Sequence, residues 1–75
     1  MSESELKAVA DAADMIVNGY AFTVTDGSVR VLNLSAPSRA VVLSHAGEVL
    51  ETSMDDIELS IVGEYYCRSR DFLAV

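Results

Sequence analysis

The sequence predicts an α+β fold in which a four-stranded antiparallel β-meander is flanked by an N-terminal and a C-terminal helix (α-β-β-β-β-α). Two stretches with helical periodicity lie at the ends of the chain, and short β-rich runs between them are separated by turn sequences. The chain has 75 residues, of which 51% are hydrophobic. This is enough for one small core, so we expect a single domain over residues 1–75.

Residues 2–18 are expected to form the first helix. Ser2 followed by Glu5 fits a capping box, and Asn18-Gly19 would end the helix because glycine adopts the left-handed conformation without a Cβ clash. The apolar residues recur at three- and four-residue spacing and share one face. They are Leu6, Val9, Ala10, Ala13, Ile16 and Val17.

Residues 20–34 are predicted to form a hairpin around Asp26-Gly27, a dipeptide typical of a type I′ turn in which Gly27 has a positive φ. A two-residue loop there pairs apolar residues on one face. The pairs are Phe22 with Val31 and Val24 with Val29. We expect both helices to cover this face. The opposite face carries Thr23, Arg30, Leu32 and Leu34.

Residues 39–44 and 48–52 are predicted to be the third and fourth strands. The residues between them, 44–47, suit a type I turn closed by a left-handed glycine, which produces a bulge. The register remains open by one residue, so either Val41 or Val42 faces the core.

Residues 54–72 are predicted to form the second helix, capped by Ser53 with Asp56 in the reciprocal position. Its apolar residues form two adjacent faces. We assign the first to the sheet: Met54, Ile57, Ile61, Tyr65 and Phe72. The second is more than one sheet contact needs: Leu59, Val62, Tyr66 and Leu73.

The charge excludes two classes of partner. The formal net charge is −7, with 5 Lys and Arg against 12 Asp and Glu. Nucleic acids and anionic membranes are bound through basic residues, so we expect neither. The acidic start of the chain lacks the basic residues of a signal peptide, and we therefore expect a cytoplasmic protein.

No catalytic constellation is visible. A Cys–His pair needs a third group to orient the histidine, and nothing in the sequence brings the single His45 and the single Cys67 together. One cysteine excludes an internal disulfide and a multi-cysteine zinc site. There is also no glycine-rich phosphate loop and no His-Glu-x-x-His. We expect a protein that is not an enzyme, with no catalytic residues, no metal site and no cofactor.

Two candidate surfaces remain. The first is an acidic patch, which could bind a basic protein, hold a hard cation or serve only as a solvated surface. It consists of Glu48, Glu51, Asp55, Asp56 and Glu58. The second is apolar surface for self-association, either on the sheet or on the second helix. It consists of Leu32 and Leu34 on the sheet and Leu59, Val62 and Tyr66 on the helix.

These observations favour a small acidic protein–protein interaction or regulatory module without catalytic activity, which self-associates as a homodimer. The alternative is an acidic inhibitor or antitoxin-like protein that masks a basic site on a partner protein.

Overall fold

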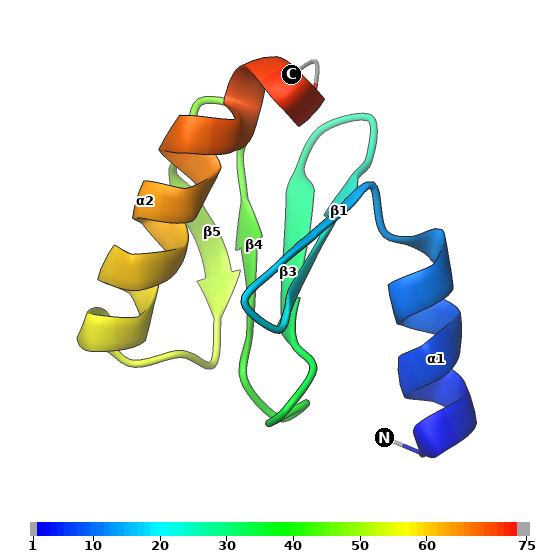
Figure 1. The fold of residues 1–75 in the computed structure, drawn as a ribbon. Helices are drawn as coiled ribbons and strands as arrows, with labels where there is room; N and C mark the ends of the chain where they lie inside the picture. Colours follow the sequence, from blue (N-terminus) through cyan, green and yellow to red (C-terminus); the bar gives the residue numbers. More distant parts are fainter. Residues whose placement is uncertain (1, 74–75) are drawn as a thin grey trace.

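The computed structural model describes residues 2–73 (Figure 1). The elements are α1 (Glu3–Ala12), β1 (Met15–Val17), β2 (Tyr20–Val24), β3 (Val29–Asn33), β4 (Ala40–Leu43), β5 (Val49–Thr52) and α2 (Asp56–Leu73). The strands form one antiparallel sheet in the order β1-β2-β3-β4-β5. The predicted α+β meander with a helix at each end is confirmed, but the sheet has five strands rather than four.

The additional strand comes from the second half of the predicted first helix. The start of that helix is as expected, since the Ser2 hydroxyl accepts a hydrogen bond from the Glu5 amide. Asn18-Gly19, however, does not cap a helix: φ is 48° at Asn18 and 82° at Gly19. Two consecutive positive φ values make a type I′ turn, which joins β1 to β2 with Val17 opposite Tyr20.

The β2–β3 hairpin has the predicted register, with Phe22 opposite Val31 and Val24 opposite Val29. Its turn is different, because neither Asp26 nor Gly27 has a positive φ. The turn is therefore not of type I′. It is closed by a hydrogen bond of 2.8 Å from the Thr25 amide to the Ser28 carbonyl and by a contact between their hydroxyls.

The β4–β5 hairpin resolves the open register. Val41 is buried in the core and Val42 lies on the opposite face. The predicted turn is confirmed: the Gly47 amide donates to the Ser44 carbonyl at 2.9 Å, and φ of Gly47 is 95°.

Helix α2 covers one face of the sheet mainly with the second of its two predicted apolar faces. Val62 and Tyr66 are each 1% exposed, whereas Ile57 and Phe72, which were assigned to the sheet, are 75% and 74% exposed. The core consists of Phe22, Val29, Val31, Val41, Leu43, Met54, Val62, Tyr66 and Leu73. Of the residues assigned to the sheet, Met54 is buried and Tyr65 packs against the core, whereas Ile57, Ile61 and Phe72 are exposed, so α2 is rotated toward the second apolar face relative to the prediction.

The cap of α2 also differs from the prediction. The Asp55 carboxylate accepts from the Glu58 amide at 2.8 Å, so Asp55 rather than Ser53 caps the helix. The Ser53 hydroxyl instead donates to the Ser38 carbonyl at 2.6 Å and accepts from the Ala40 amide. Ser53 therefore fastens the end of β5 to the start of β4.

Helix α1 lies on the other side of the sheet from α2, which contradicts the expectation that both helices cover the same face (Figure 1). The residue that follows α1 and its C-cap, Asp14, sets this arrangement. Its amide donates to the Phe22 carbonyl at 2.8 Å and its carboxylate accepts from the Val24 amide at 2.7 Å. The chain is thus bound to β2 as soon as α1 ends.

The two turns give a direct test of the fold. We expect Gly19→Ala to lower the free energy of unfolding by about 1–2 kcal/mol, because a residue with a Cβ is disfavoured at positive φ. Gly27→Ala should change it by less than about 1 kcal/mol, since Gly27 has an ordinary φ and an added Cβ meets nothing within 4 Å. Urea denaturation measures both, and equal losses would contradict the two turn assignments.

Candidate functional site

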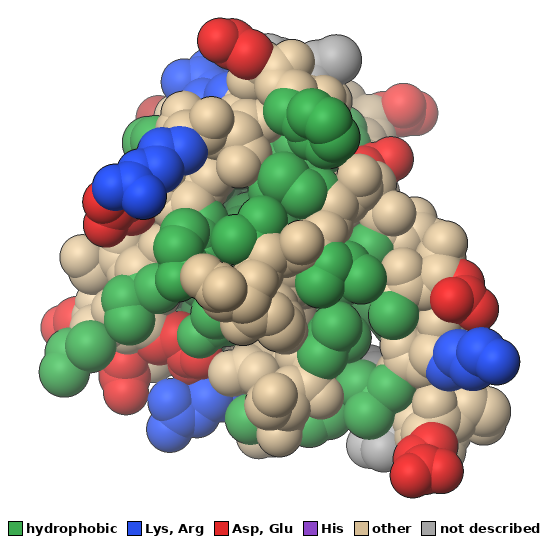
Figure 2. Space-filling model, in the orientation of Figure 1, with side chains coloured by type: hydrophobic (Ala, Val, Ile, Leu, Met, Phe, Trp, Pro, Cys, Tyr) green, Lys and Arg blue, Asp and Glu red, His purple; other side chains and the backbone are tan. Residues whose placement is uncertain are grey.

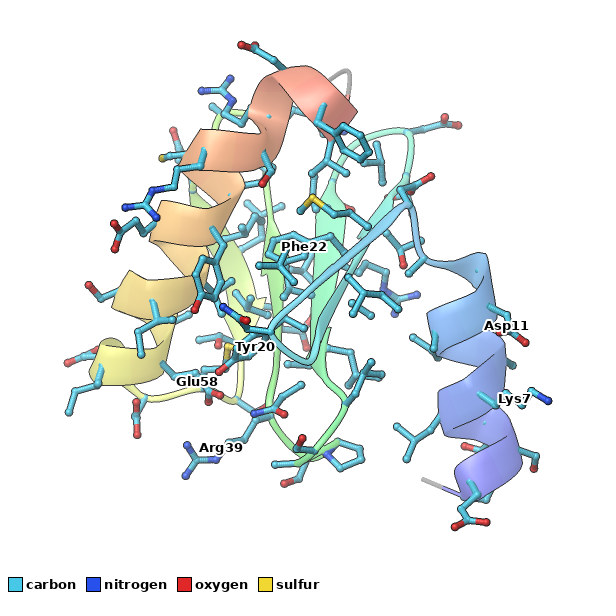
Figure 3. All side chains as sticks on the ribbon, viewed as in Figure 1. Lys7, Asp11, Tyr20, Phe22, Arg39 and Glu58 are labelled. Carbon is cyan, nitrogen blue, oxygen red and sulfur yellow. The ribbon has the colours of Figure 1, made fainter. Side chains whose placement is uncertain are left out.

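One residue of the predicted acidic patch, Glu58, is not on the surface. It is 7% exposed and lies in the first turn of α2. Its carboxylate accepts hydrogen bonds from the Tyr20 hydroxyl at 2.8 Å, from Asn33 Nδ2 at 2.9 Å and from Arg39 Nη1 at 3.2 Å (Figure 3). These donors come from the start of β2, the end of β3 and the residue before β4. The assignment of Glu58 to an exposed patch is therefore wrong.

The hydrogen bonds determine the charge of this cluster. Burial raises the pKa of Glu58, but the hydrogen bonds from Tyr20, Asn33 and Arg39 outweigh burial and hold the pKa below its usual value. The same bond to Glu58 raises the pKa of the Tyr20 hydroxyl. Glu58 is thus ionised and Tyr20 protonated at neutral pH, a fixed arrangement suited to stabilising the fold.

Neighbouring groups complete the cluster. Asn33 Oδ1 accepts from the amides of Ser35 and Ala36 at 2.9 and 3.0 Å, so this side chain also orders the turn after β3. The Tyr65 ring lies 6.1 Å from the Tyr20 ring, and its hydroxyl accepts from Asn18 at 3.0 Å. No buried side-chain nitrogen or oxygen among the described residues lacks a partner.

The other acidic candidates are exposed. Glu48 lies in the β4–β5 turn, Glu51 lies on β5, and Asp56 begins α2. Asp55 lies 3.6 Å from Arg39, which also contacts Glu58. Within residues 2–73 no three His, Cys, Asp or Glu side chains are grouped so that they could hold a metal ion.

His45 and Cys67, the residues considered for a Cys–His pair, have separate surroundings. His45 Nε2 lies 2.9 Å from the Thr25 carbonyl, to which it donates, and the His45 carbonyl accepts from the Tyr66 hydroxyl. Cys67 is exposed on α2. Neither α1 nor α2, as described, is long and apolar enough to cross a membrane.

The residues of the predicted apolar surface on α2 are not exposed. Val62 and Tyr66 are buried in the core, and Leu59 packs against it half-buried. The prediction that Val62 and Tyr66 form a self-association surface is therefore wrong, and Leu59 lies half-buried at the margin of the core. The exposed apolar residues of α2 are Ile57, Ile61 and Phe72.

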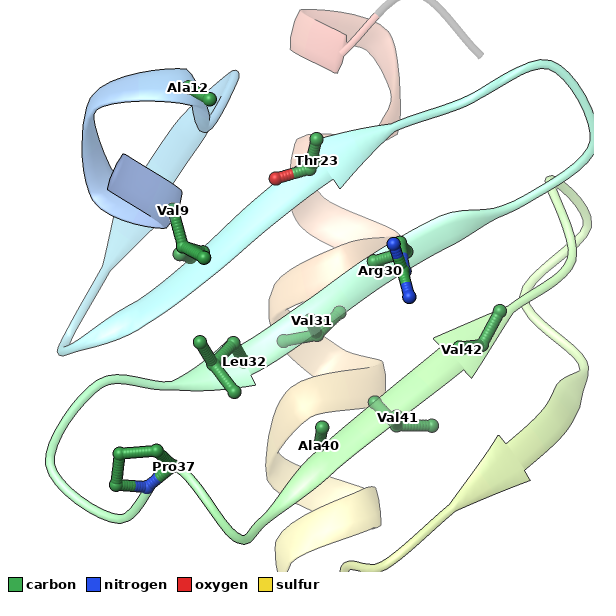
Figure 4. Close-up of a pocket in the computed structure, with 11 residues that line it drawn as sticks. Val9, Ala12, Thr23, Arg30, Val31, Leu32, Pro37, Ala40, Val41 and Val42 are labelled. Carbon is green, nitrogen blue, oxygen red and sulfur yellow. The ribbon is translucent and has the colours of Figure 1, made fainter. Parts of the chain in front are cut away.

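The apolar surface on the sheet is present. A groove of about 400 Å³ lies between α1 and the sheet face opposite α2 (Figure 4). Val9 and Ala12 form the α1 side of it, and Leu32, Ala40 and Val42 lie along the sheet. Figure 2 shows apolar side chains gathered between the β1–β2 hairpin and α1. Of the two predicted sheet residues, Leu32 lines the groove, while Leu34 follows β3 and is half-buried.

The groove also contains Arg30, an exposed residue for which the described structure shows no ion pair. Sequence reasoning placed Arg30 on this face but gave it no role. It likewise missed Tyr20, Asn33 and Arg39 as partners of Glu58. The available signal was helical spacing, because Glu58 lies four residues before Val62 and shares its face.

The buried carboxylate predicts a pH dependence. The pKa of Glu58 is lower in the folded state than its ordinary value of 4.5. The unfolded state therefore binds the proton first, and the stabilisation, complete above pH 4.5, is lost as the pH falls through the folded-state pKa. We expect Glu58→Gln to lower stability at pH 7 by about 1.5–3 kcal/mol and to reduce the loss of stability on acidification.

Glu64→Gln is the matched control, because Glu64 is an exposed carboxylate on the same helix, paired with Arg68 at i, i+4. It should cost less than about 0.5 kcal/mol. Urea denaturation between pH 7 and pH 3 measures both variants. Equal acid sensitivity in wild type and Glu58→Gln would show that this carboxylate does not control acid stability.

A comparison with protein-family models places these features in a family. Residues 3–73 match the model of DUF7723, a family of unknown function. No curated protein and no solved structure matches the chain. The matched segment contains both helices and all five strands, including the Glu58 cluster and the groove beneath α1. The chain therefore belongs to the DUF7723 family.

Proposed function

We propose that the protein is a cytoplasmic protein–protein interaction module without catalytic activity, and that it self-associates as a homodimer through the sheet face opposite α2. The observation that carries the proposal is the incomplete cover of this face. Helix α1 has no buried residue and leaves an apolar groove between itself and the sheet.

The sheet face opposite α2 keeps half-buried apolar side chains at Leu32, Ala40 and Val42, which line the groove. A domain of 75 residues buries a smaller share of its surface than a larger domain does, and it gains stability when a partner covers part of what remains. The charged side chains of α1 do not obstruct the groove, since Lys7 and Asp11 point away from the sheet (Figure 3). The commonest partner that fits one such face is a second copy.

The polar groups support a role without catalysis. The buried carboxylate of Glu58 accepts hydrogen bonds from β2, from β3 and from Arg39 just before β4, and it thereby holds α2 against these segments. The groove offers one hydroxyl, on Thr23, and one guanidinium, on Arg30. A hydroxyl nucleophile needs an adjacent general base, and the groove lining contains neither a histidine nor a carboxylate.

The alternative is an acidic inhibitor or antitoxin-like protein that masks a basic site. Exposed carboxylates at Glu48, Glu51 and Asp56 favour it through electrostatic complementarity. The burial of Glu58 and the contact of Asp55 with Arg39 reduce the charge of this surface, so its support is weaker. A basic protein captured at low salt and lost at high salt would favour this alternative.

Sedimentation equilibrium tests self-association. At about 50 µM chain and moderate salt we expect a species of twice the chain mass of 8.1 kDa. Val42→Lys should shift the population to monomer, because it places a charge in the middle of the uncovered sheet face. Ile57→Lys is the matched control on the outer side of α2 and should leave the dimer intact. A single 8.1 kDa species in the wild-type protein would refute the proposal.

A further inference from the structure

We propose that two copies pack these sheet faces together about a two-fold axis that runs along β4, so that Arg30 of each copy pairs with the partner's Glu51. This inference rests on the proposed self-association and specifies its geometry. It follows from a row of side chains across β3, β4 and β5, from the open groove beneath α1 and from the exposed edge of the sheet.

The row consists of Arg30, Val42 and Glu51. Arg30 lies opposite Val42, and Val42 lies opposite Glu51. Residues paired across antiparallel strands point to the same face, so all three face away from α2. They also line one shallow hollow of about 280 Å³, and Figure 4 shows Arg30 and Val42 with α2 behind the sheet.

Within one copy the two charges are separated. Neighbouring strands lie about 4.8 Å apart, so Arg30 and Glu51, which flank Val42 on either side, have backbones about 10 Å apart. Neither residue forms an ion pair within the described structure. The sheet face thus presents a positive group and a negative group on either side of an apolar centre.

Symmetry turns this row into a self-complementary surface. A two-fold axis along β4 exchanges the strands on either side of it, so that β3 of one copy lies over the partner's β5. Arg30 then faces the partner's Glu51 twice, and Val42 meets its own copy on the axis. An axis across the strands would instead bring Arg30 against the partner's Arg30. Packed sheets lie about 10 Å apart, a gap that an arginine and a glutamate side chain can bridge.

The same axis accounts for the groove. It places the partner's β5 over β3, between α1 and β4, which is where the groove lies. In one copy β5 is an edge strand whose residues are all exposed; Leu50, at 57% exposure, lies between Glu51 on this face and Val49, which pairs with Leu43 on the face toward α2. Exposed edge strands with apolar side chains are usually covered in native proteins. The dimer would cover β5 with the partner's α1.

Charge reversal tests this pairing. We expect Arg30→Glu or Glu51→Arg to weaken the dimer by about 100-fold, because each change places like charges together at two symmetric positions. The double variant Arg30→Glu/Glu51→Arg should return the dissociation constant to within about threefold of wild type. Arg68→Glu, which makes the same change in net charge as Arg30→Glu but on the exposed side of α2, should have little effect.

Cross-linking provides a second measurement that does not depend on charge. In a Cys67→Ser background, Val42→Cys should be joined to its own copy by a short bismaleimide, because residue 42 lies on the axis. Ile57→Cys in the same background should not be joined. Thermal unfolding of every variant confirms that the fold is retained.

The outcomes separate the two proposals. A wild-type monomer would refute self-association and this geometry together. A wild-type dimer in which the double variant is not restored, or in which Arg30→Glu behaves like Arg68→Glu, would refute the axis along β4 and leave self-association standing.

Discussion

The fold depends on the buried carboxylate of Glu58. An ionised carboxylate costs several kcal/mol to bury unless its oxygens are hydrogen-bonded, so its donors must all be delivered to one place. Tyr20 on β2, Asn33 on β3 and Arg39 just before β4 do this. The requirement sets the rotation of α2: once Glu58 points inward, Val62 and Tyr66, four and eight residues later, must point inward as well.

Because α2 packs on one face of the sheet, the opposite face must be covered by another part of the chain. Within residues 2–73, α1, with 10 residues, is the one helix on this face, and Asp14 binds the chain to β2 directly after it. A helix of this length reaches about 15 Å and cannot cover five strands. The part of this face over β3, β4 and β5 is therefore left uncovered because α1 is short. The proposed dimer uses this part of the sheet.

The features that were predicted correctly from the sequence are those determined by residues close together in the chain. The register of Phe22 with Val31 and the turn before Gly47 depend on neighbouring residues, and both are confirmed. Asn18-Gly19 was misassigned because the same dipeptide suits a helix end and a type I′ turn. The inward face of α2 was not predictable from spacing alone, since the deciding donors lie 19 to 38 residues away from Glu58. For the same reason, Glu58 was predicted to belong to an exposed acidic patch, although its carboxylate is buried.

The remaining arginine links composition to assembly. Of the basic residues, Arg39 contacts Glu58, Arg68 pairs with Glu64 and Arg70 lies over the Tyr66 ring at 5.8 Å. Arg30 alone stands on an apolar sheet face, where any partner that covers it must supply an anion. A second copy of a chain with a net charge of −7 supplies one at Glu51. Repulsion between two such chains acts at long range and is screened beyond about 8 Å at physiological salt, whereas the proposed pair is local and partly desolvated. The net charge is therefore compatible with the proposed homodimer, because the repulsion between the chains is screened with distance while the Arg30–Glu51 pairs act at short range.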